Sequence, residues 1–355
     1  MKKIFALILC VCTLLAVISC NTPAKEADYK LGMGVVVDMN SSSSEKHNAQ
    51  VDATVATVVL DAEGKIVACR IDVAQNKMNV TDGAVDAALT FKTKMELGDD
   101  YNMAKYGQSM DWNKDGVVKE WYDQAKAFEN YVVGKTAAEV QAIKTQTVEG
   151  QGYVIAADEA LLHAGCTIQI TEFISAVVAA CKDEQGMSFK ATEGSFTLGV
   201  AATTDASESK AAEGEETGLV AMYTDFAATV IVDGKIVAAL NDAIQPKITI
   251  NASGEIVEKA YVATKRNLKE DYNMAKHGAS MDPNNDGKVL EWYIQSEAFS
   301  KHVVGMTADQ VANMGTAANS IGYQMSTDAD LLAAGCTIQI TSMKAVMASA
   351  AKNAR

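Results

Sequence analysis

Residues 100–136 read DYNMAKYGQSMDWNKDGVVKEWYDQAKAFENYVVGKT, and residues 271–307 read DYNMAKHGASMDPNNDGKVLEWYIQSEAFSKHVVGMT. The two stretches are identical at 24 of 37 positions, without a gap and at a constant separation of 171 residues. So long a match indicates an internal duplication in which each copy is one structural unit. We therefore expect two homologous units in tandem.

Each copy contains an apolar stripe with the period of an α-helix. Trp121 begins a row of apolar residues at i, i+4, i+7 and i+11, and Trp292 begins the matching row in the second copy. Gly134 is placed to end this helix, because glycine adopts the left-handed conformation at helix ends. Thr136 and Glu139 then form a capping box that starts another helix.

The segments before these stretches have the pattern of β-hairpins. Residues 51–60 and 65–73 are rich in β-branched side chains and flank a Glu63-Gly64 turn. Residues 227–232 and 235–240 repeat the hairpin around Asp233-Gly234. Later in each unit, we expect a strand at residues 167–171 and a closing amphipathic helix.

These elements predict an α+β fold of two tandem homologous domains, each an antiparallel sheet with packed helices. The first repeat domain is expected at residues 29–187 and the second at residues 188–355. A chain of 355 residues is long enough for each unit to bury its own core.

Composition narrows the classes of function. The formal net charge of −14 would repel a phosphate backbone, so we expect no nucleic-acid partner. No Ser-His-Asp, Cys-His or paired-carboxylate set has a credible spacing. This favours a non-enzymatic electron carrier or binding protein over an enzyme.

The N-terminus has the pattern of a targeting segment. Residues 1–19 combine two lysines with an apolar run that is short for a membrane span. The run ends in Val-Ile-Ser-Cys20, which resembles the lipobox of bacterial lipoproteins. That resemblance implies lipidation of Cys20, residues 20–28 as a tether, and an extracytoplasmic protein that is lipid-anchored to the membrane. The alternative is an ordinary secretory signal with a chance cysteine.

Four further cysteines would remain in the mature chain. Cys166 and Cys336 occupy equivalent repeat positions, whereas Cys69 and Cys181 have alanine counterparts. A disulfide framework would normally be duplicated with the fold, so we expect free thiols.

An Asp/Asn-rich loop in each copy has the spacing of a calcium site. The candidate ligands are Asp111, Asn113, Asp115 and Glu120 in the first copy and Asp282, Asn284, Asp286 and Glu291 in the second. Oxygen ligands at loop positions 1, 3 and 5 and a glycine at position 6 are what such a loop needs. The acidic residue stands at position 10, whereas an EF-hand has it at position 12. The alternative is a turn whose acids favour the start of the following helix.

The motif Ala164-Gly165-Cys166-Thr167-Ile-Gln-Ile-Thr recurs with the same residues from Ala334 onward. With the hairpins and the Glu-Trp-Tyr helix, each repeat resembles the FMN-binding-domain lipoproteins of bacterial surfaces. Some members of that family bear FMN as a phosphoester on the threonine of a Ser-Gly-Ala-Thr motif. The resemblance implies FMN as a cofactor, with Thr167 and Thr337 as attachment points and Gly165 and Gly335 as small residues beside it.

The first position of the family motif is alanine in both copies. Non-covalent flavin therefore stays open, as does a cofactor-free descendant in which the glycine only stops a helix before a buried strand.

Two functions remain. One is a membrane-anchored extracytoplasmic lipoprotein with two FMN-binding-like domains, which serves in flavin-based electron transfer and has a flavin transferase and redox proteins as partners. The other is a calcium-stabilised surface lipoprotein that binds a partner without redox chemistry.

Overall fold

Strands and helices follow the same order in the two halves of the chain. The computed structural model describes residues 26–355 except 112–115, 151, 277–288 and 320–321. The strands of the first half are β1 (Glu26–Asp38), β2 (Asn48–Leu60), β3 (Ile66–Asn79), β4 (Thr145–Thr147) and β5 (Val154–Ala156). Its α-helices are α1 (Lys94–Leu97), α2 (Trp121–Val132), α3 (Ala137–Gln141), α4 (Glu159–His163) and α5 (Thr171–Cys181).

The second half follows a similar order, but its strands are shorter and more numerous. Its strands are β6 (Met187–Thr192), β7 (Thr197–Asp205), β8 (Gly218–Ala221), β9 (Tyr223–Val232), β10 (Lys235–Ile244), β11 (Lys247–Ile250), β12 (Ile256–Ala260), β13 (Thr316–Ala318) and β14 (Gln324–Ser326). Its helices are α6 (Lys265–Leu268), α7 (Trp292–His302), α8 (Ala308–Ala312), α9 (Ala329–Ala333) and α10 (Thr341–Lys352). The 3-10 segments are η1 (Thr81–Gly83), η2 (Gly98–Tyr101), η3 (Met103–Met110) and η4 (Lys269–Tyr272).

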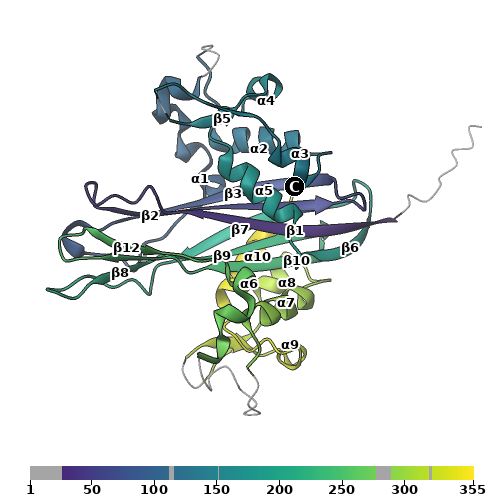
Figure 1. The fold of residues 1–355 in the computed structure, drawn as a ribbon. Helices are drawn as coiled ribbons and strands as arrows, with labels where there is room; N and C mark the ends of the chain where they lie inside the picture. The colour runs from purple at the N-terminus through teal and green to yellow at the C-terminus, as the bar shows by residue number, and fades with distance from the viewer. Residues whose placement is uncertain (1–25, 112–115, 151, 277–288, 320–321) are drawn as a thin grey trace, which may run out of the picture.

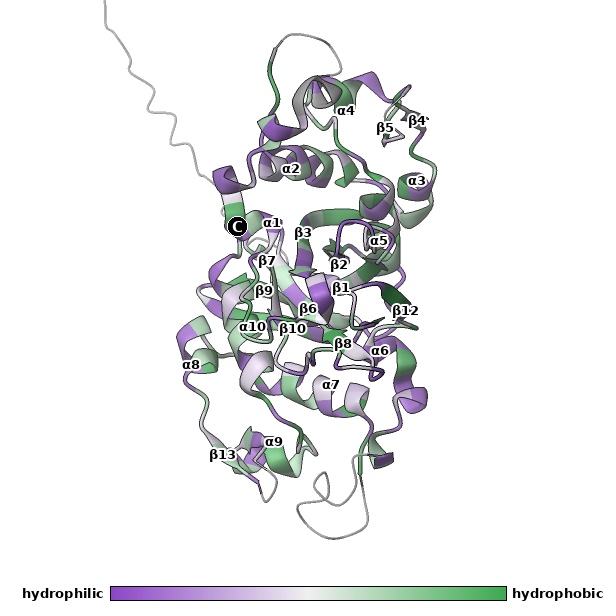
Figure 2. Cartoon of the chain, turned by 90° about the vertical axis from the view of Figure 1, so that its left-hand side faces the viewer, coloured by the Kyte–Doolittle hydropathy of each residue, from purple (hydrophilic) through white to green (hydrophobic). Residues whose placement is uncertain are grey.

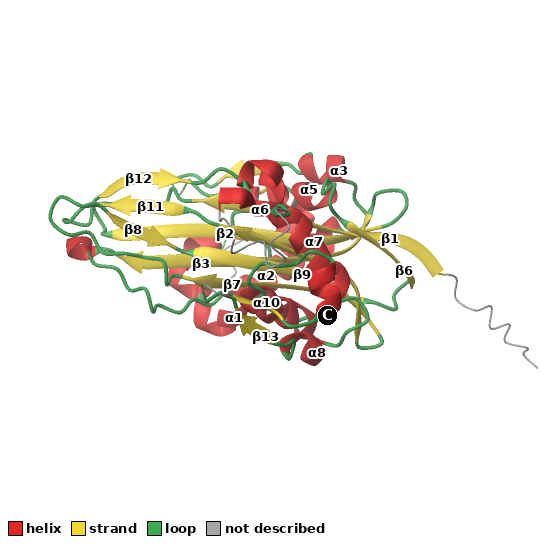
Figure 3. Ribbon diagram, turned by 90° about the horizontal axis from the view of Figure 1, so that it is seen from below, coloured by secondary structure: helices red, strands yellow, loops and turns green. Residues whose placement is uncertain are grey.

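The two main sheets are antiparallel. One has the strand order β3-β2-β1-β6 and the other the order β10-β9-β7. A third sheet, β12-β11-β8, lies with them at one end of the molecule, where Figure 3 shows it reaching beyond the helices. The predicted α+β class is confirmed, and both hairpins lie where the sequence places them.

The main sheets stack face to face, and the helices cover their outer faces (Figure 1). Side chains alternate along each strand: Val55 of β2 and Phe226 of β9 belong to the core between the sheets. Val58 of β2 packs instead against the helices of the first half, and Ala227 of β9 against those of the second. Burial on both faces explains why each of these strands has apolar residues on both of its sides.

The predicted helical stripe is confirmed in α2. All four positions of the row that begins at Trp121 are buried. Gly134 follows the helix with φ +82°, and Thr136 and Glu139 form the predicted capping box. Figure 2 shows α2 and α7 on opposite sides of the strands, so each Trp helix closes the outer face of its own sheet.

Several contacts join the two halves. Strand β6, from the start of the second half, pairs with β1. The guanidinium of Arg266 forms a buried ion pair with Asp183 at 3.2 Å. Arg355 reaches the carboxylate of Glu129 in the first half at 3.1 Å. The halves therefore share both a sheet and an apolar core.

Candidate functional site

Thr167 and Thr337 lie just after tight bends. Gly165 and Gly335 have φ angles of +94° and +92°, which a residue with a Cβ rarely adopts. A Cβ on Gly165 would also meet the Lys119 side chain at 2.5 Å, and the Lys119 Nζ donates to the Ala164 carbonyl. The two glycines are therefore required by the backbone itself.

The predicted strand at residues 167–171 is wrong. Residues 166–170 form no strand, and α5 already begins at Thr171. The physical reason is a side chain: the backbone amide of Thr167 donates to Oε1 of Gln124 at 2.8 Å, where a strand would need a neighbouring backbone carbonyl. The second half repeats the arrangement, with the amide of Thr337 on Oε1 of Gln295.

The threonine hydroxyls point to the same glutamines. The Oγ1 atoms of Thr167 and Thr337 donate to Gln124 and Gln295 at 3.1 and 3.2 Å, and each threonine is only 7% exposed. A phosphoester on either hydroxyl would require this bond to be given up.

A cavity of about 270 Å³ opens directly after Thr167 in the first half. We call it the Lys94 pocket. Among its lining residues are Asp52, Lys94, Tyr101, Trp121, Tyr153 and Phe173. Ile168 and Gln169, the residues that follow Thr167, complete one wall. The cavity is just below the usual size range of small-molecule sites, and aromatic walls with a few polar groups are typical of them.

Lys94 is the cation of this pocket. Its Nζ lies 5.0 Å from the centre of the Tyr101 ring and 5.5 Å from that of Trp121. Burial lowers the pKa of Lys94 to about 8, while the negative charge of Asp52 acts in the opposite direction.

Asp52 supplies an unused acceptor. Its Oδ2 accepts from the Gln50 side chain at 2.7 Å. Its Oδ1 is buried and has no hydrogen-bond partner among the residues that the structure describes. Burial raises the pKa of Asp52, against the effects of the Gln50 and Gln75 side chains and of the charges of Lys94 and Lys77. A ligand N–H or O–H is what this oxygen lacks.

The second half keeps the lysine and its two rings. Nζ of Lys265 lies 5.1 Å from the Tyr272 ring and 5.4 Å from the Trp292 ring. Burial lowers the pKa of Lys265, and the nearby Asp225 opposes this shift. Asp225 stands on β9 where β2 has Thr54, so the acid comes from a different position of the equivalent strand.

A buried aspartate holds the short helix that carries each lysine. Oδ1 of Asp72 accepts from the Met95 amide at 3.2 Å, and Oδ1 of Asp242 accepts from the Arg266 amide at 3.0 Å. Burial raises the pKa of Asp72 to about 6, although hydrogen bonds from Thr93 and Met95 oppose the rise. Asp72 and Asp242 therefore position Lys94 and Lys265 in the same way.

The predicted calcium residues are described only in part. Asn113, Asp115, Asp282, Asn284 and Asp286 lie outside the described residues. Oδ2 of Asp111 accepts from the amide of Gly116 at 2.8 Å, which closes the loop between its first and sixth positions. Within the described ranges, no group of three or more His, Cys, Asp and Glu side chains is arranged to hold a metal ion.

Glu120 and Glu291 have matching structural roles. Oε2 of Glu120 accepts from the Met103 amide at 3.0 Å, and Oε2 of Glu291 accepts from the Met274 amide at 2.9 Å. Each carboxylate therefore holds the segment that precedes the loop against the start of the Trp helix.

Lys94, Asp52 and Tyr153 were not predicted as site residues. A signal exists for the lysine, because Thr93-Lys94 recurs as Thr264-Lys265 before each duplicated stretch. Asp52 leaves no such signal, since the acid beside Lys265 occupies another strand position.

The N-terminal targeting segment, with Cys20, lies outside the described residues. Over the described ranges, none of the helices combines the length and apolar character needed to cross a membrane. Cys69, Cys166, Cys181 and Cys336 are free thiols, as predicted, and burial raises the pKa of Cys166 to about 12.

Comparison with known proteins gives one curated relative. The chain is 28% identical to the chlorophenol reductase of Desulfitobacterium hafniense over 159 residues, which cover 40% of this chain and 46% of that protein. The chain thus spans less than half the length of this relative. No family model matches the chain, and no solved structure matches it.

Proposed function

We propose that this protein is a membrane-anchored extracytoplasmic lipoprotein that transfers electrons through a flavin held in the Lys94 pocket. Its halves are then two tandem FMN-binding-domain-like units, and Cys20 carries the lipid. The observation that carries the proposal is the pocket beside Thr167, which joins aromatic walls to one cation and one unpartnered carboxylate oxygen.

The residues of the pocket suit a flat ring with polar edges. Tyr101 and Trp121 contribute aromatic rings to the pocket wall. Oδ1 of Asp52 can accept from a ring N–H, and the Lys94 ammonium can donate to a ring carbonyl. When bound, FMN supplies the capacity to take up and release electrons, and the protein supplies position and local charge.

The position of the threonines favours non-covalent binding in this pocket. Thr167 Oγ1 is held by Gln124, so the phosphate would be retained without a bond to that hydroxyl. A flavin transferase is a partner only if Thr167 or Thr337 is released from its glutamine. The name of the curated relative, a reductase, agrees with redox chemistry, while its substrate is not carried over to this chain.

Titration of the full mature chain with FMN tests the proposal. We expect saturable quenching of flavin fluorescence, which Asp52→Asn and Lys94→Met weaken. Lys92→Met is the matched control, because Lys92 is an exposed lysine two residues away. Protein from membranes of the native host should carry visible flavin absorbance. Colourless host protein that also fails to bind added FMN would overturn the proposal.

The second candidate is a calcium-stabilised surface lipoprotein that binds a partner without redox chemistry. The Asp111–Gly116 hydrogen bond favours it, because it brings the first and sixth positions of the predicted calcium loop together. Thermal unfolding with calcium and with chelator tests it, as set out in the Discussion.

A further inference from the structure

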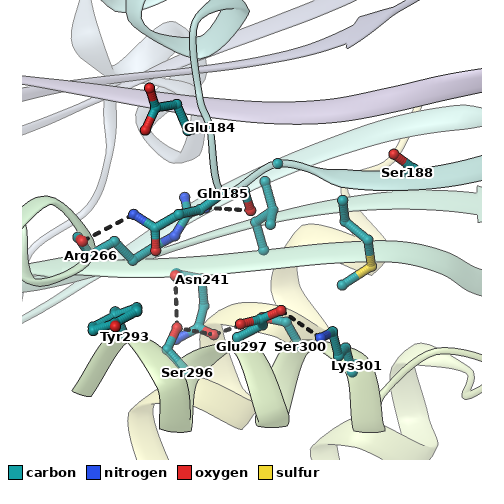
Figure 4. A pocket seen from close by; sticks show the side chains of 13 residues that line it. Glu184, Gln185, Ser188, Asn241, Arg266, Tyr293, Ser296, Glu297, Ser300 and Lys301 are labelled. Carbon is teal, nitrogen blue, oxygen red and sulfur yellow. Dashed lines mark hydrogen bonds and ion pairs between the residues drawn. The ribbon is translucent and has the colours of Figure 1, made fainter. Parts of the chain in front are cut away.

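A second cavity, of about 440 Å³, lies where the two halves meet (Figure 4). We call it the seam pocket. It is lined by the connecting segment 184–188, by Asn241 of β10, by Arg266 of α6 and by Ser296 and Ser300 of α7. The pocket shares no lining residue with the Lys94 pocket, so it is independent of the flavin proposal.

The duplication provides an internal control for these side chains. Ile71 and Ala125 occupy, in the first half, the positions of Asn241 and Ser296, and both are fully buried and apolar. At these two positions the first half is satisfied by apolar packing, whereas in the place of Ser300 it has the buried Glu129, which accepts from the Ile71 amide. The polar side chains of Asn241 and Ser296 are therefore additional to what the fold requires.

Asn241 is left with an unsatisfied polar atom. Its Oδ1 accepts from the hydroxyls of Ser296 and Ser300, each at 3.0 Å. Its Nδ2 is buried without a hydrogen-bond partner in the part of the chain that the structure describes, and the residue is 1% exposed. Turning the amide over would leave the oxygen unpaired instead. A ligand hydroxyl serves either orientation, because it both donates and accepts.

The charged groups of the seam pocket are already paired. Arg266 bonds to the Asp183 carboxylate and to the Gln185 carbonyl, and Lys301 pairs with Glu297 at 2.5 Å. An ionic ligand would meet no uncompensated charge on these groups. The Tyr293 ring lines the pocket as well and offers a flat apolar face, of the kind that packs against the C–H groups of a sugar ring.

We infer that the seam pocket binds a neutral, hydroxyl-rich small molecule of the size of one or two sugar rings. The ligand completes the hydrogen bonding of Asn241. The hydroxyls of Ser296 and Ser300 donate to Asn241 and accept hydrogen bonds from the ligand. A cavity of this volume lies within the range of small-molecule sites. Because the connecting segment 184–188 forms one wall, the occupant would contact both halves at once.

Calorimetric titration of the full mature chain with glucose, galactose, N-acetylglucosamine, maltose and myo-inositol tests this inference. We expect saturable binding of at least one probe. The variant N241I/S296A carries the residues of the first half at these two positions. Its affinity for that probe should be at least about tenfold lower, because it loses one or more hydrogen bonds. Ser175→Ala, an exposed serine on α5, is the matched control and should bind normally.

Circular dichroism checks that N241I/S296A folds. If it does not, Tyr293→Ala replaces it, since this ring is only half-buried on α7 and its loss should weaken binding with little effect on folding. The inference is overturned if no probe binds, if the variant binds as well as the parent protein, or if a crystal structure soaked with the probes shows only water on Asn241.

Discussion

The side-chain oxygen of Gln124 accepts both the backbone amide and the hydroxyl of Thr167, at 2.8 and 3.1 Å. The Nε2 of the same glutamine donates to the Lys119 carbonyl at 2.8 Å. One buried side chain thus connects the bend after α4 to the segment before α2. Gln295 does the same for Thr337 in the second half.

Replacing Gln124 by alanine should destabilise the protein by about 2–4 kcal/mol. The change removes three hydrogen bonds and leaves the Thr167 amide buried without a partner. Urea unfolding followed by tryptophan fluorescence measures the loss. Gln141→Ala, an exposed glutamine at the end of α3, should cost well under 1 kcal/mol. Equal costs for the two variants would contradict the structural role of Gln124.

Asp72→Asn should make the protein more stable at neutral pH. The pKa of Asp72 is raised from 3.8 to about 6, so between these values the folded chain binds more protons than the unfolded chain. Stability from this group is therefore present below pH 3.8 and falls as the pH rises to about 6. The variant escapes that loss, and its amide oxygen can still accept from Met95 and Val73.

The gain of Asp72→Asn is expected to be roughly 1–3 kcal/mol at pH 7 and to vanish near pH 4. Thermal unfolding across this pH range measures it. Asp86→Asn is the control, because Asp86 is exposed and its Oδ1 accepts from the Ala88 amide in a similar way. A variant less stable than the parent at pH 7 would show that the carboxylate hydrogen bonds outweigh the burial of its charge.

Local elements could be predicted because their causes are local. The stripe that begins at Trp121, the glycine stop at Gly134 and the Thr136–Glu139 box each depend on residues within a few turns of chain. The segment 167–171 was predicted wrongly as a strand for the opposite reason. Its apolar alternation suits a strand, but its partner is a side chain 43 residues away in sequence, on α2.

The face-to-face packing of the two sheets could not be predicted from the sequence. A signal was present in β2, where both Val55 and Val58 are apolar although they face opposite sides. Such a strand is buried on both faces, but the pattern does not identify the helices or the second sheet that cover it. The pairing of β1 with β6 joins strands from different halves, and nothing in either strand selects that partner.

Asp183→Asn should cost about 3–5 kcal/mol and lower the stability of both halves together. It leaves the guanidinium of Arg266 buried without its counter-charge, at a point where α5 of one half meets α6 of the other. Because the halves share a core, we expect one cooperative unfolding transition, detected alike by calorimetry and by fluorescence.

The double variant D183N/R266M should recover part of this loss, since it removes the unpaired charge. Asp28→Asn is the matched control: its ion pair with Lys190 is exposed on both sides, and its loss should change stability by about 0.5 kcal/mol or less. Two separate transitions in the parent protein would contradict the shared core.

Calcium should raise the melting temperature, and a chelator should reverse the effect, if the Asp-rich loops hold the ion. Calcium at tenfold excess over its dissociation constant adds about 1.4 kcal/mol for each occupied site. The variant E120Q/E291Q separates calcium binding from the structural role of the two glutamates. Glutamine keeps an oxygen that can accept from the Met103 and Met274 amides, so the calcium-free stability should be unchanged. The charge that attracts a cation is lost, so the response to calcium should disappear. A parent protein that melts at the same temperature in calcium and in chelator would leave Glu120 and Glu291 as structural carboxylates alone.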